Sequence, residues 1–157
     1  IVLIQVPGQI TDKMQLVKVV PGRKTKDNKV TTGSIFSDVP NQIDITVRNT
    51  GNSILKPFGT IAVEKGGKTV ANIQLNNSDV KATVLPNSNR VFNEELKDLK
   101  GFGRFSITTN VSYGNGGDIL TQKTSVWVIP VWLGAGIGVG VLAIAAVVFV
   151  LVRKFRR

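Results

Sequence analysis

The sequence contains no cysteine and no histidine among its 157 residues. Without cysteine the chain forms neither a disulfide framework nor a thiolate metal site. Without histidine it lacks a second common zinc ligand and the side chain that most often transfers protons near neutral pH. We therefore expect no catalytic residue, no metal site and no cofactor, and we do not expect an enzyme.

Carboxylates are the remaining candidates for acid–base chemistry, and Glu94, Glu95 and Asp98 form the densest group. Neighbouring residues of a strand point to opposite faces, so Glu94 and Glu95 would not act together. Lys97 and Lys100 lie in the same stretch. The pattern is that of a solvated charge patch, and a hydrolytic enzyme is disfavoured.

Charge is also absent from one long stretch, because no charged residue occurs between Thr124 and Val152. This stretch divides the chain into a body (1–128), an apolar segment (129–152) and a short tail (153–157). The 22 positions from Val131 to Val152 would span about 33 Å as a helix, enough for a hydrocarbon core of about 30 Å. The sequence therefore predicts a single C-terminal transmembrane α-helix.

The residues that flank this segment predict its orientation. Trp127 and Trp132 stand at its outer boundary, where indole rings favour the headgroup level, and Pro130 falls at the expected helix start. The tail carries four cations, Arg153, Lys154, Arg156 and Arg157. Positive residues favour the cytoplasmic side, so we expect a protein of the cell membrane with its N-terminal body outside and its C-terminus in the cytoplasm.

Glycine recurs in the outer third of the predicted helix. Gly134, Gly136, Gly138 and Gly140 form two pairs spaced four residues apart, Gly134/Gly138 and Gly136/Gly140. Small residues at this spacing let two helix backbones approach closely, which indicates a homodimer face or a groove for another membrane helix. Glycine is also frequent in transmembrane helices in general, so a simple anchor remains the alternative.

The body has the pattern of an all-β domain. Residues 43–47 and 105–113 alternate apolar and polar side chains, and in the second segment the odd positions are expected to face a core. Further strands are expected at 1–6, 14–20, 59–65, 69–75, 81–85, 90–94 and 119–128. Only residues 93–100 suggest a short helical turn. Eight or nine short strands in this length favour an Ig-like β-sandwich, with a barrel as the alternative.

Turn-forming residues separate these strands. Lys65-Gly66-Gly67-Lys68 is expected to join a hairpin, and Gly114-Asn115-Gly116-Gly117 to connect the last two strands. Asn49-Thr50-Gly51-Asn52 is expected to form a tight turn because its residues tolerate positive φ. The chain starts at Ile1 without a methionine, and we expect the body to be the C-terminal part of a longer ectodomain.

Several of these turn and strand motifs occur together in one known family. They are Asn49-Thr50-Gly51-Asn52, Leu55-Lys56-Pro57-Phe58-Gly59, Leu85-Pro86-Asn87-Ser88-Asn89-Arg90-Val91-Phe92, Gly101-Phe102-Gly103-Arg104-Phe105, Val111-Ser112-Tyr113-Gly114 and Trp127-Val128-Ile129-Pro130. Over residues 43–152 the chain resembles the membrane-proximal Ig-like domain of bacterial WxL-interacting-type surface proteins. The resemblance implies adhesion or surface assembly. The peptidoglycan-binding half of that family is not in this sequence, so wall binding is not implied.

The net charge is +10, and the four cations of the tail leave 16 Lys and Arg against 10 acidic residues in the body. Five body cations lie close together, Lys18, Arg23, Lys24, Lys26 and Lys29. Such a stretch favours an anionic partner, although a solvated loop has the same composition. No aromatic residue is interleaved to stack on bases, so we expect no nucleic-acid partner.

These patterns favour a non-enzymatic, single-pass cell-surface protein that presents a β-sandwich for adhesion or for assembly of the surface or wall. Its expected partners are the lipid bilayer, other surface or membrane proteins including a second copy of itself, and an anionic wall polymer. The alternative is a small accessory subunit of a larger membrane complex, held through the glycine face of its helix.

Overall fold

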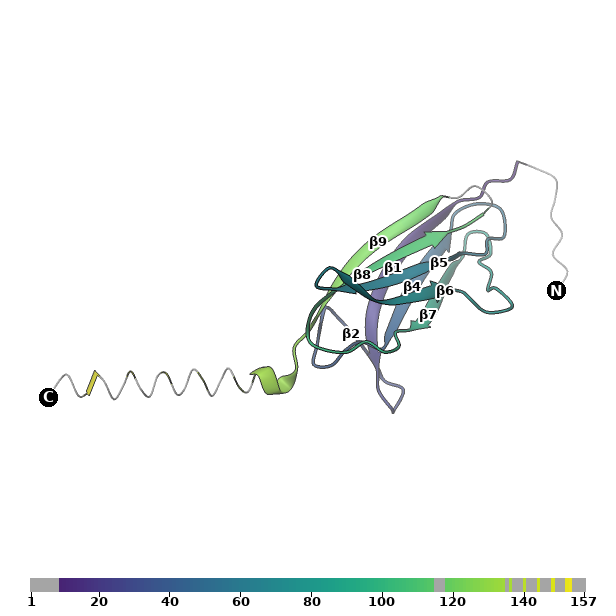
Figure 1. Ribbon diagram of the computed structural model, residues 1–157. Coiled ribbons are helices and arrows are strands. Elements are labelled where there is room, and N and C mark those ends of the chain that lie inside the picture. Colours follow the sequence, from purple (N-terminus) through teal and green to yellow (C-terminus); the bar gives the residue numbers. More distant parts are fainter. Residues whose placement is uncertain are drawn as a thin grey trace.

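The computed structural model describes residues 9–114 and 118–134, together with residues 136, 140, 144, 148, 152 and 153. Nine β-strands lie within these residues and form two sheets, as Figure 1 shows. The strands are β1 (Met14–Lys24), β2 (Val30–Thr32), β3 (Ile35–Phe36), β4 (Gln42–Asn49), β5 (Phe58–Lys65), β6 (Lys68–Leu75), β7 (Asn89–Glu95), β8 (Gly103–Ser112) and β9 (Ile119–Val128). The all-β class predicted from the sequence is confirmed.

One sheet has the strand order β2-β1-β4-β7 and the other has the order β3-β9-β8-β5-β6. Every pair is antiparallel except β3 and β9, which run parallel through Ile35↔Trp127 and Phe36↔Val128. Across the two sheets, β1 lies beside β9 and β6 lies beside β7. The two sheets therefore pack face to face as a sandwich, with the edge strands β6 and β7 meeting on one side and β1 and β9 on the other.

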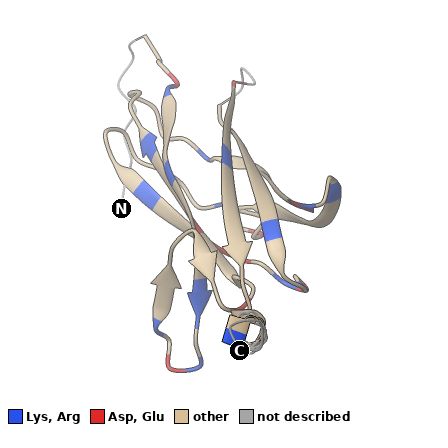
Figure 2. Ribbon diagram, turned by 90° about the vertical axis from the view of Figure 1, so that its left-hand side faces the viewer, with Lys and Arg blue, Asp and Glu red and all other residues tan. Residues whose placement is uncertain are grey.

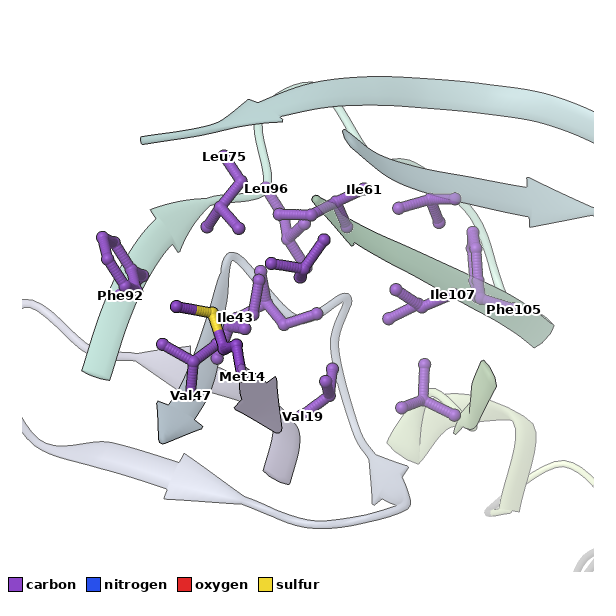
Figure 3. Packing of buried hydrophobic residues seen from close by; sticks show 14 of the residues in the cluster. Met14, Val19, Ile43, Val47, Ile61, Leu75, Phe92, Leu96, Phe105 and Ile107 are labelled. Carbon is purple, nitrogen blue, oxygen red and sulfur yellow. The ribbon is translucent and has the colours of Figure 1, made fainter. Parts of the chain in front are cut away.

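The core follows from the alternation of side chains along the strands. Ile43, Ile45 and Val47 of β4 are fully buried, while the residues between them are partly exposed. Figure 3 shows side chains of β4 pointing toward Ile61 and Ile107, which come from the opposite sheet. Each inward aliphatic side chain of this kind contributes about 1.5–3 kcal/mol by leaving water, so the alternation itself fixes which face of each strand is inside.

The same rule holds in β8, where the odd-numbered positions from Phe105 to Tyr113 are all buried as predicted. Thr109 is the one polar residue in that series, and it is fully buried between Ile107 and Val111. Its hydroxyl has no hydrogen-bond partner among the residues that the structure describes.

The hairpin predicted at Lys65–Lys68 is confirmed, because β5 and β6 pair there and Gly66 and Gly67 adopt φ values of 58° and 78°. β8 and β9 also form the predicted hairpin, and its turn begins at Gly114 with a φ of 63°. Residues 115–117 of that turn lie outside the described residues.

Two predicted elements differ from the structure, and two observed strands had no prediction. Residues 81–85 form no strand and contribute a single bridge, Val84 to Leu55, because they cross from one sheet to the other. Residues 93–100 form no helical turn, because β7 continues to Glu95 through its pairing with β4. The short strands β2 and β3 were not predicted, since two or three residues are too few to show alternation. The strand expected at 1–6 lies outside the described residues.

Only two residues, Ile129 and Pro130, separate the end of β9 from a helical turn that begins at Val131. Leu133 donates its backbone N–H to Pro130 O at 3.0 Å, and the described residues from Gly136 to Arg153 are also helical. The described residues contain no helix that is both long and apolar enough to span a membrane. Most of the predicted segment 129–152 lies outside them.

Candidate functional site

The five-cation stretch centres on a hairpin between β1 and β2, here called the basic hairpin (residues 23–30). Its arms pair through Arg23↔Thr31 and Lys24↔Val30. Thr25 donates its N–H to Lys29 O at 2.9 Å, and Asn28 adopts a φ of 60° at the turn. Asparagine tolerates this left-handed conformation better than most residues, which explains a tight turn without glycine.

Lys24, Lys26 and Lys29 of the basic hairpin are exposed, and none of them lies within ion-pair distance of a carboxylate in the described part of the chain. Figure 2 shows blue on both arms of this hairpin and red at its turn, where Asp27 lies. Three lysines against one aspartate leave an outward positive surface, which attracts anions.

Arg23 and Lys18 have different positions. Arg23 Nη2 lies 3.1 Å from Asp38 Oδ2, and Arg23 Nη1 donates to Val39 O at 2.9 Å. Its charge is therefore used to tie β1 to the loop before β4. Lys18 is exposed in the middle of β1, beside the bulge at Val17. Six residues of strand place it about 20 Å from Lys24, so the structure does not bring Lys18 to the hairpin.

A second group of residues gathers where the chain leaves the sandwich, and we call it the aromatic base (Lys65, Phe102, Phe105 and Trp132). The rings of Phe102 and Trp132 meet edge to face with centroids 6.1 Å apart. Lys65 Nζ lies 5.7 Å from the centroid of Phe102 and 5.4 Å from that of Phe105. A cation over aromatic rings at such distances is attracted by their electron-rich faces.

Gly101 makes this position of Lys65 possible. A Cβ built on Gly101 would collide with Lys65 Nζ, and the φ of 101° is one that side-chain-bearing residues rarely adopt. The ammonium group therefore lies against bare backbone at the end of the sandwich.

A groove runs beside the aromatic base, between the loops before β4 and before β8 and the first helical turn. Its cavity volume is about 790 Å³. Apolar side chains from all three segments line it, including Val39, Leu99, Phe102 and Trp132. Lys100 adds an exposed cation to the same lining.

Large apolar side chains remain exposed at this end of the molecule. Phe102 is 51% exposed and Trp132 is 64% exposed. Trp127 is 48% exposed on β9, where it pairs with Ile35 on one side and Arg104 on the other. Exposed aromatic and aliphatic groups that occur together mark an interaction surface rather than an ordinary solvated face.

The glycine positions of the predicted helix are partly described. Gly134, Gly136 and Gly140 are helical, and a Cβ built on any of them would meet nothing within 4 Å among the described residues. Gly138 lies outside the described residues, and so do Lys154, Arg156 and Arg157 of the tail. Arg153 is described, helical and exposed.

Two of the three carboxylates in residues 94–98, those of Glu94 and Glu95, have partners. Glu94 Oε1 accepts a hydrogen bond from the N–H of Asn76 at 3.0 Å, and Glu95 Oε2 lies 3.3 Å from Lys97 Nζ. The residues that the structure describes hold no cluster of three possible metal-ligating side chains.

Sequence reasoning did not assign Lys65 or Phe102 to a site. Lys65 was treated as a hairpin residue, and Phe102 as part of a strand start between two glycines. The signal available in the sequence was a phenylalanine between two glycines. In the structure Gly101 and Gly103 have φ values of 101° and 100°, and Phe102 is 51% exposed.

No protein-family model and no curated protein matches this chain. Among solved structures it is similar to a β-glucosidase from Listeria innocua in complex with glucose, with a TM-score of 0.39 and 7% identity. The alignment covers 78% of this chain and 17% of that protein. A similarity of this size carries no argument about the activity of the present chain.

Proposed function

We propose that this chain is a non-enzymatic, single-pass cell-surface protein that presents an Ig-like β-sandwich for adhesion or for assembly of the surface or wall. The observation that carries the proposal is the short connection between the sandwich and the apolar segment. β9 ends at Val128 and helical residues begin at Val131, so only Ile129 and Pro130 separate the domain from the start of the 22 uncharged positions. A domain joined this closely to an anchor stands next to the bilayer.

The strand order supports the Ig-like part of the proposal. In Ig domains one sheet contains strands A, B, E and D, and the other contains strands C, F and G. Here β1, β4 and β7 share one sheet and correspond to A, B and E. β5, β8 and β9 share the other sheet and correspond to C, F and G. β3 then pairs in parallel with the last strand, so the N-terminal strand region contributes to both sheets.

The binding surface that we propose is the basic hairpin, through Lys24, Lys26 and Lys29. These side chains are exposed and their charges are not paired within the described residues. An outward positive surface of this kind fits an anionic wall polymer or an acidic protein. The resemblance to the membrane-proximal domain of WxL-interacting-type proteins adds an envelope setting to the proposal.

The binding part is tested with the full chain and purified cell envelopes. Reversal of Lys24, Lys26 and Lys29 to Glu is expected to reduce retention at low salt by at least tenfold, because it changes the hairpin from positive to negative. The matched control reverses Lys13, Lys56 and Lys123, which are exposed lysines elsewhere on the domain. Equal retention of both triple variants and the unaltered chain would reject the hairpin as the binding surface.

The alternative function is that of an accessory subunit held in a larger membrane complex by its helix. It is favoured by Gly136 and Gly140, which lie four residues apart in the helical segment and which no atom of the described residues approaches within 4 Å of a Cβ position. Replacement of Gly134, Gly136, Gly138 and Gly140 by Leu is expected to dissociate such a complex in detergent. Unaltered migration on native gels would leave the segment as an anchor only.

A further inference from the structure

We propose that the helix-facing end of the sandwich is a binding surface for phospholipid headgroups, formed by Phe102, Trp132, Lys65 and Lys100. This inference rests on the proposed anchor and names a second partner for the domain, the anionic lipids of the leaflet from which the helix emerges. It concerns the aromatic base and its groove. The groove includes Arg23 of the basic hairpin, whose charge is paired with Asp38, but not Lys24, Lys26 or Lys29.

The first argument is the combination of exposure and chemistry at this end. Phe102 and Trp132 are more than half exposed although they are large and apolar. Exposure of such rings to water is unfavourable, whereas the headgroup region of a bilayer accommodates aromatic rings together with cations. Exposed rings beside lysines fit that region better than they fit bulk solvent.

The second argument is the position of Lys65. On β5 it follows the inward positions Ile61 and Val63, so its side chain is directed toward the end of the sandwich rather than along its outer face. It is only partly exposed, and its Nζ lies over Gly101 and two rings without a carboxylate in ion-pair distance among the described residues. A half-buried ammonium group without a carboxylate partner attracts a phosphate group.

The third argument is continuity. Trp132 belongs to the helical turn that follows β9, and Phe102 contacts its ring from the loop before β8. The sandwich therefore touches the start of the segment proposed to enter the bilayer. A domain held in this way places the groove and Lys100 at the level where lipid phosphates lie.

The test uses indole fluorescence in the full chain, reconstituted into vesicles whose lipids carry bromine high on the acyl chain. The chain has two tryptophans, so Trp127→Phe with Trp132→Phe provides a background without indole. Phe102→Trp in that background places the one indole in the aromatic base, where its quenching measures contact with lipid. Phe58→Trp is the matched control, because Phe58 is 44% exposed at the opposite end of β5.

We expect the indole introduced by Phe102→Trp to be quenched in vesicles of phosphatidylcholine with phosphatidylglycerol, and much less in phosphatidylcholine alone. The indole introduced by Phe58→Trp is expected to be unaffected in both. Lys65→Gln with Lys100→Gln should raise the fraction of phosphatidylglycerol needed for half-maximal quenching several-fold. Circular dichroism of each variant checks that the sandwich is folded.

Three outcomes would overturn the inference. Quenching at position 102 that does not depend on phosphatidylglycerol would exclude headgroup charge as its cause. Absence of quenching at position 102, with Trp132 still quenched in a Trp127→Phe variant, would show that the domain stands away from the bilayer while its anchor remains inserted. Shielding of position 102 from iodide only on intact cells, without quenching in vesicles, would assign the base to a protein partner. A Trp132 that no brominated lipid quenches would instead reject the proposed anchor.

Discussion

The two ends of the sandwich differ in how many of their polar side chains are used to hold loops. At the end far from the helix, Asn49 is fully buried, and its Nδ2 donates to Ser53 O at 2.7 Å and to Val84 O at 3.0 Å. Its Oδ1 accepts the N–H of Gly51 at 2.9 Å. The Asn49 side chain thus provides hydrogen bonds for three backbone groups in two loops, where no neighbouring strand is present to provide them.

Asn76 does the same in the loop between β6 and β7. It is 6% exposed, and its Nδ2 donates to Pro57 O at 2.8 Å and to Ala82 O at 3.0 Å, while its Oδ1 accepts the N–H of Ala82 at 2.8 Å. At the helix end, by contrast, Lys24, Lys26 and Lys29 extend outward from their hairpin. The helix end also has polar groups that build the fold, since Asn41 exchanges two hydrogen bonds with the backbone of Lys24. What distinguishes this end is the set of three outward lysines that remain for a partner.

The largest effect that would sharpen this comparison is expected from Asn49→Ala or Asn76→Ala. Each change removes three hydrogen bonds to backbone groups, at about 1 kcal/mol per bond, so each is expected to lower the free energy of unfolding by about 3 kcal/mol. Urea denaturation of the full chain in mild detergent measures it. Asn77→Ala is the control, because Asn77 is exposed beside Asn76. If Asn77→Ala lowered the free energy of unfolding as much as Asn76→Ala, the hydrogen bonds of Asn76 would not be what holds the loops.

At the helix end, Gly101→Ala is expected to cost about 1–3 kcal/mol, because alanine is strained at a φ of 101° and its Cβ displaces Lys65. Gly134→Ala is the matched control, since a Cβ there meets no atom of the described part of the chain within 4 Å. Thermal unfolding followed by circular dichroism measures both. If Gly101→Ala were as stable as the control, the geometry given for the aromatic base would be wrong.

Between the two ends, Thr109→Val tests the one buried hydroxyl that has no partner among the described residues. Valine has nearly the same shape and removes the cost of an unsatisfied polar group, so a gain of about 1 kcal/mol in the free energy of unfolding is expected. Thr108→Val, on the opposite face of β8, is the control. A loss of stability at position 109 would mean that the hydroxyl has a partner after all.

The smallest effect on stability is expected from reversing Lys24, Lys26 and Lys29 to Glu. Each exposed side chain without a partner changes the free energy of unfolding by at most about 0.5 kcal/mol, with either sign, so the three together are expected to change it by less than about 1 kcal/mol. The same variant is expected to lose envelope binding, so at this end of the sandwich binding can be lost without a loss of stability. A large loss of stability on urea denaturation would mean that these lysines, like Asn49, belong to the fold.

The positions of the strands could be predicted from the sequence, because apolar and polar residues alternate in segments such as 43–47 and 105–113 in step with buried and exposed side chains. The Asn49–Asn52 motif shows where such reasoning stops. It was assigned to a turn that needs positive φ, yet none of its residues has one. Instead Gly51 is required because a Cβ there would collide with Thr11 O, and Asn52 Oδ1 accepts the N–H of Thr11 at 2.7 Å.

The candidate site was harder to predict from the sequence, because it too depends on contacts between segments. Lysines within a few residues of one another are visible in any sequence, so the basic hairpin was found, except that Lys18 lies too far along β1 to belong to it. Lys65, Phe102 and Trp132 are far apart in the chain and meet only because β5, the loop before β8 and the helical turn end together. Contacts between distant segments leave no local pattern to read.

The parallel pairing of β3 with β9 has a mechanical consequence. The described chain begins at one end of the sandwich and leaves it at the other through β9 (Figure 1). Tension applied between these ends acts first on β1 and β9, which lie in different sheets. β3 follows β1 along the chain and pairs in parallel with β9, so it is loaded along the length of β9 once β1 has left β4. The slanted hydrogen bonds of that parallel pair then resist the pull together. This short pair would therefore keep the domain attached to its tether after β1 has detached.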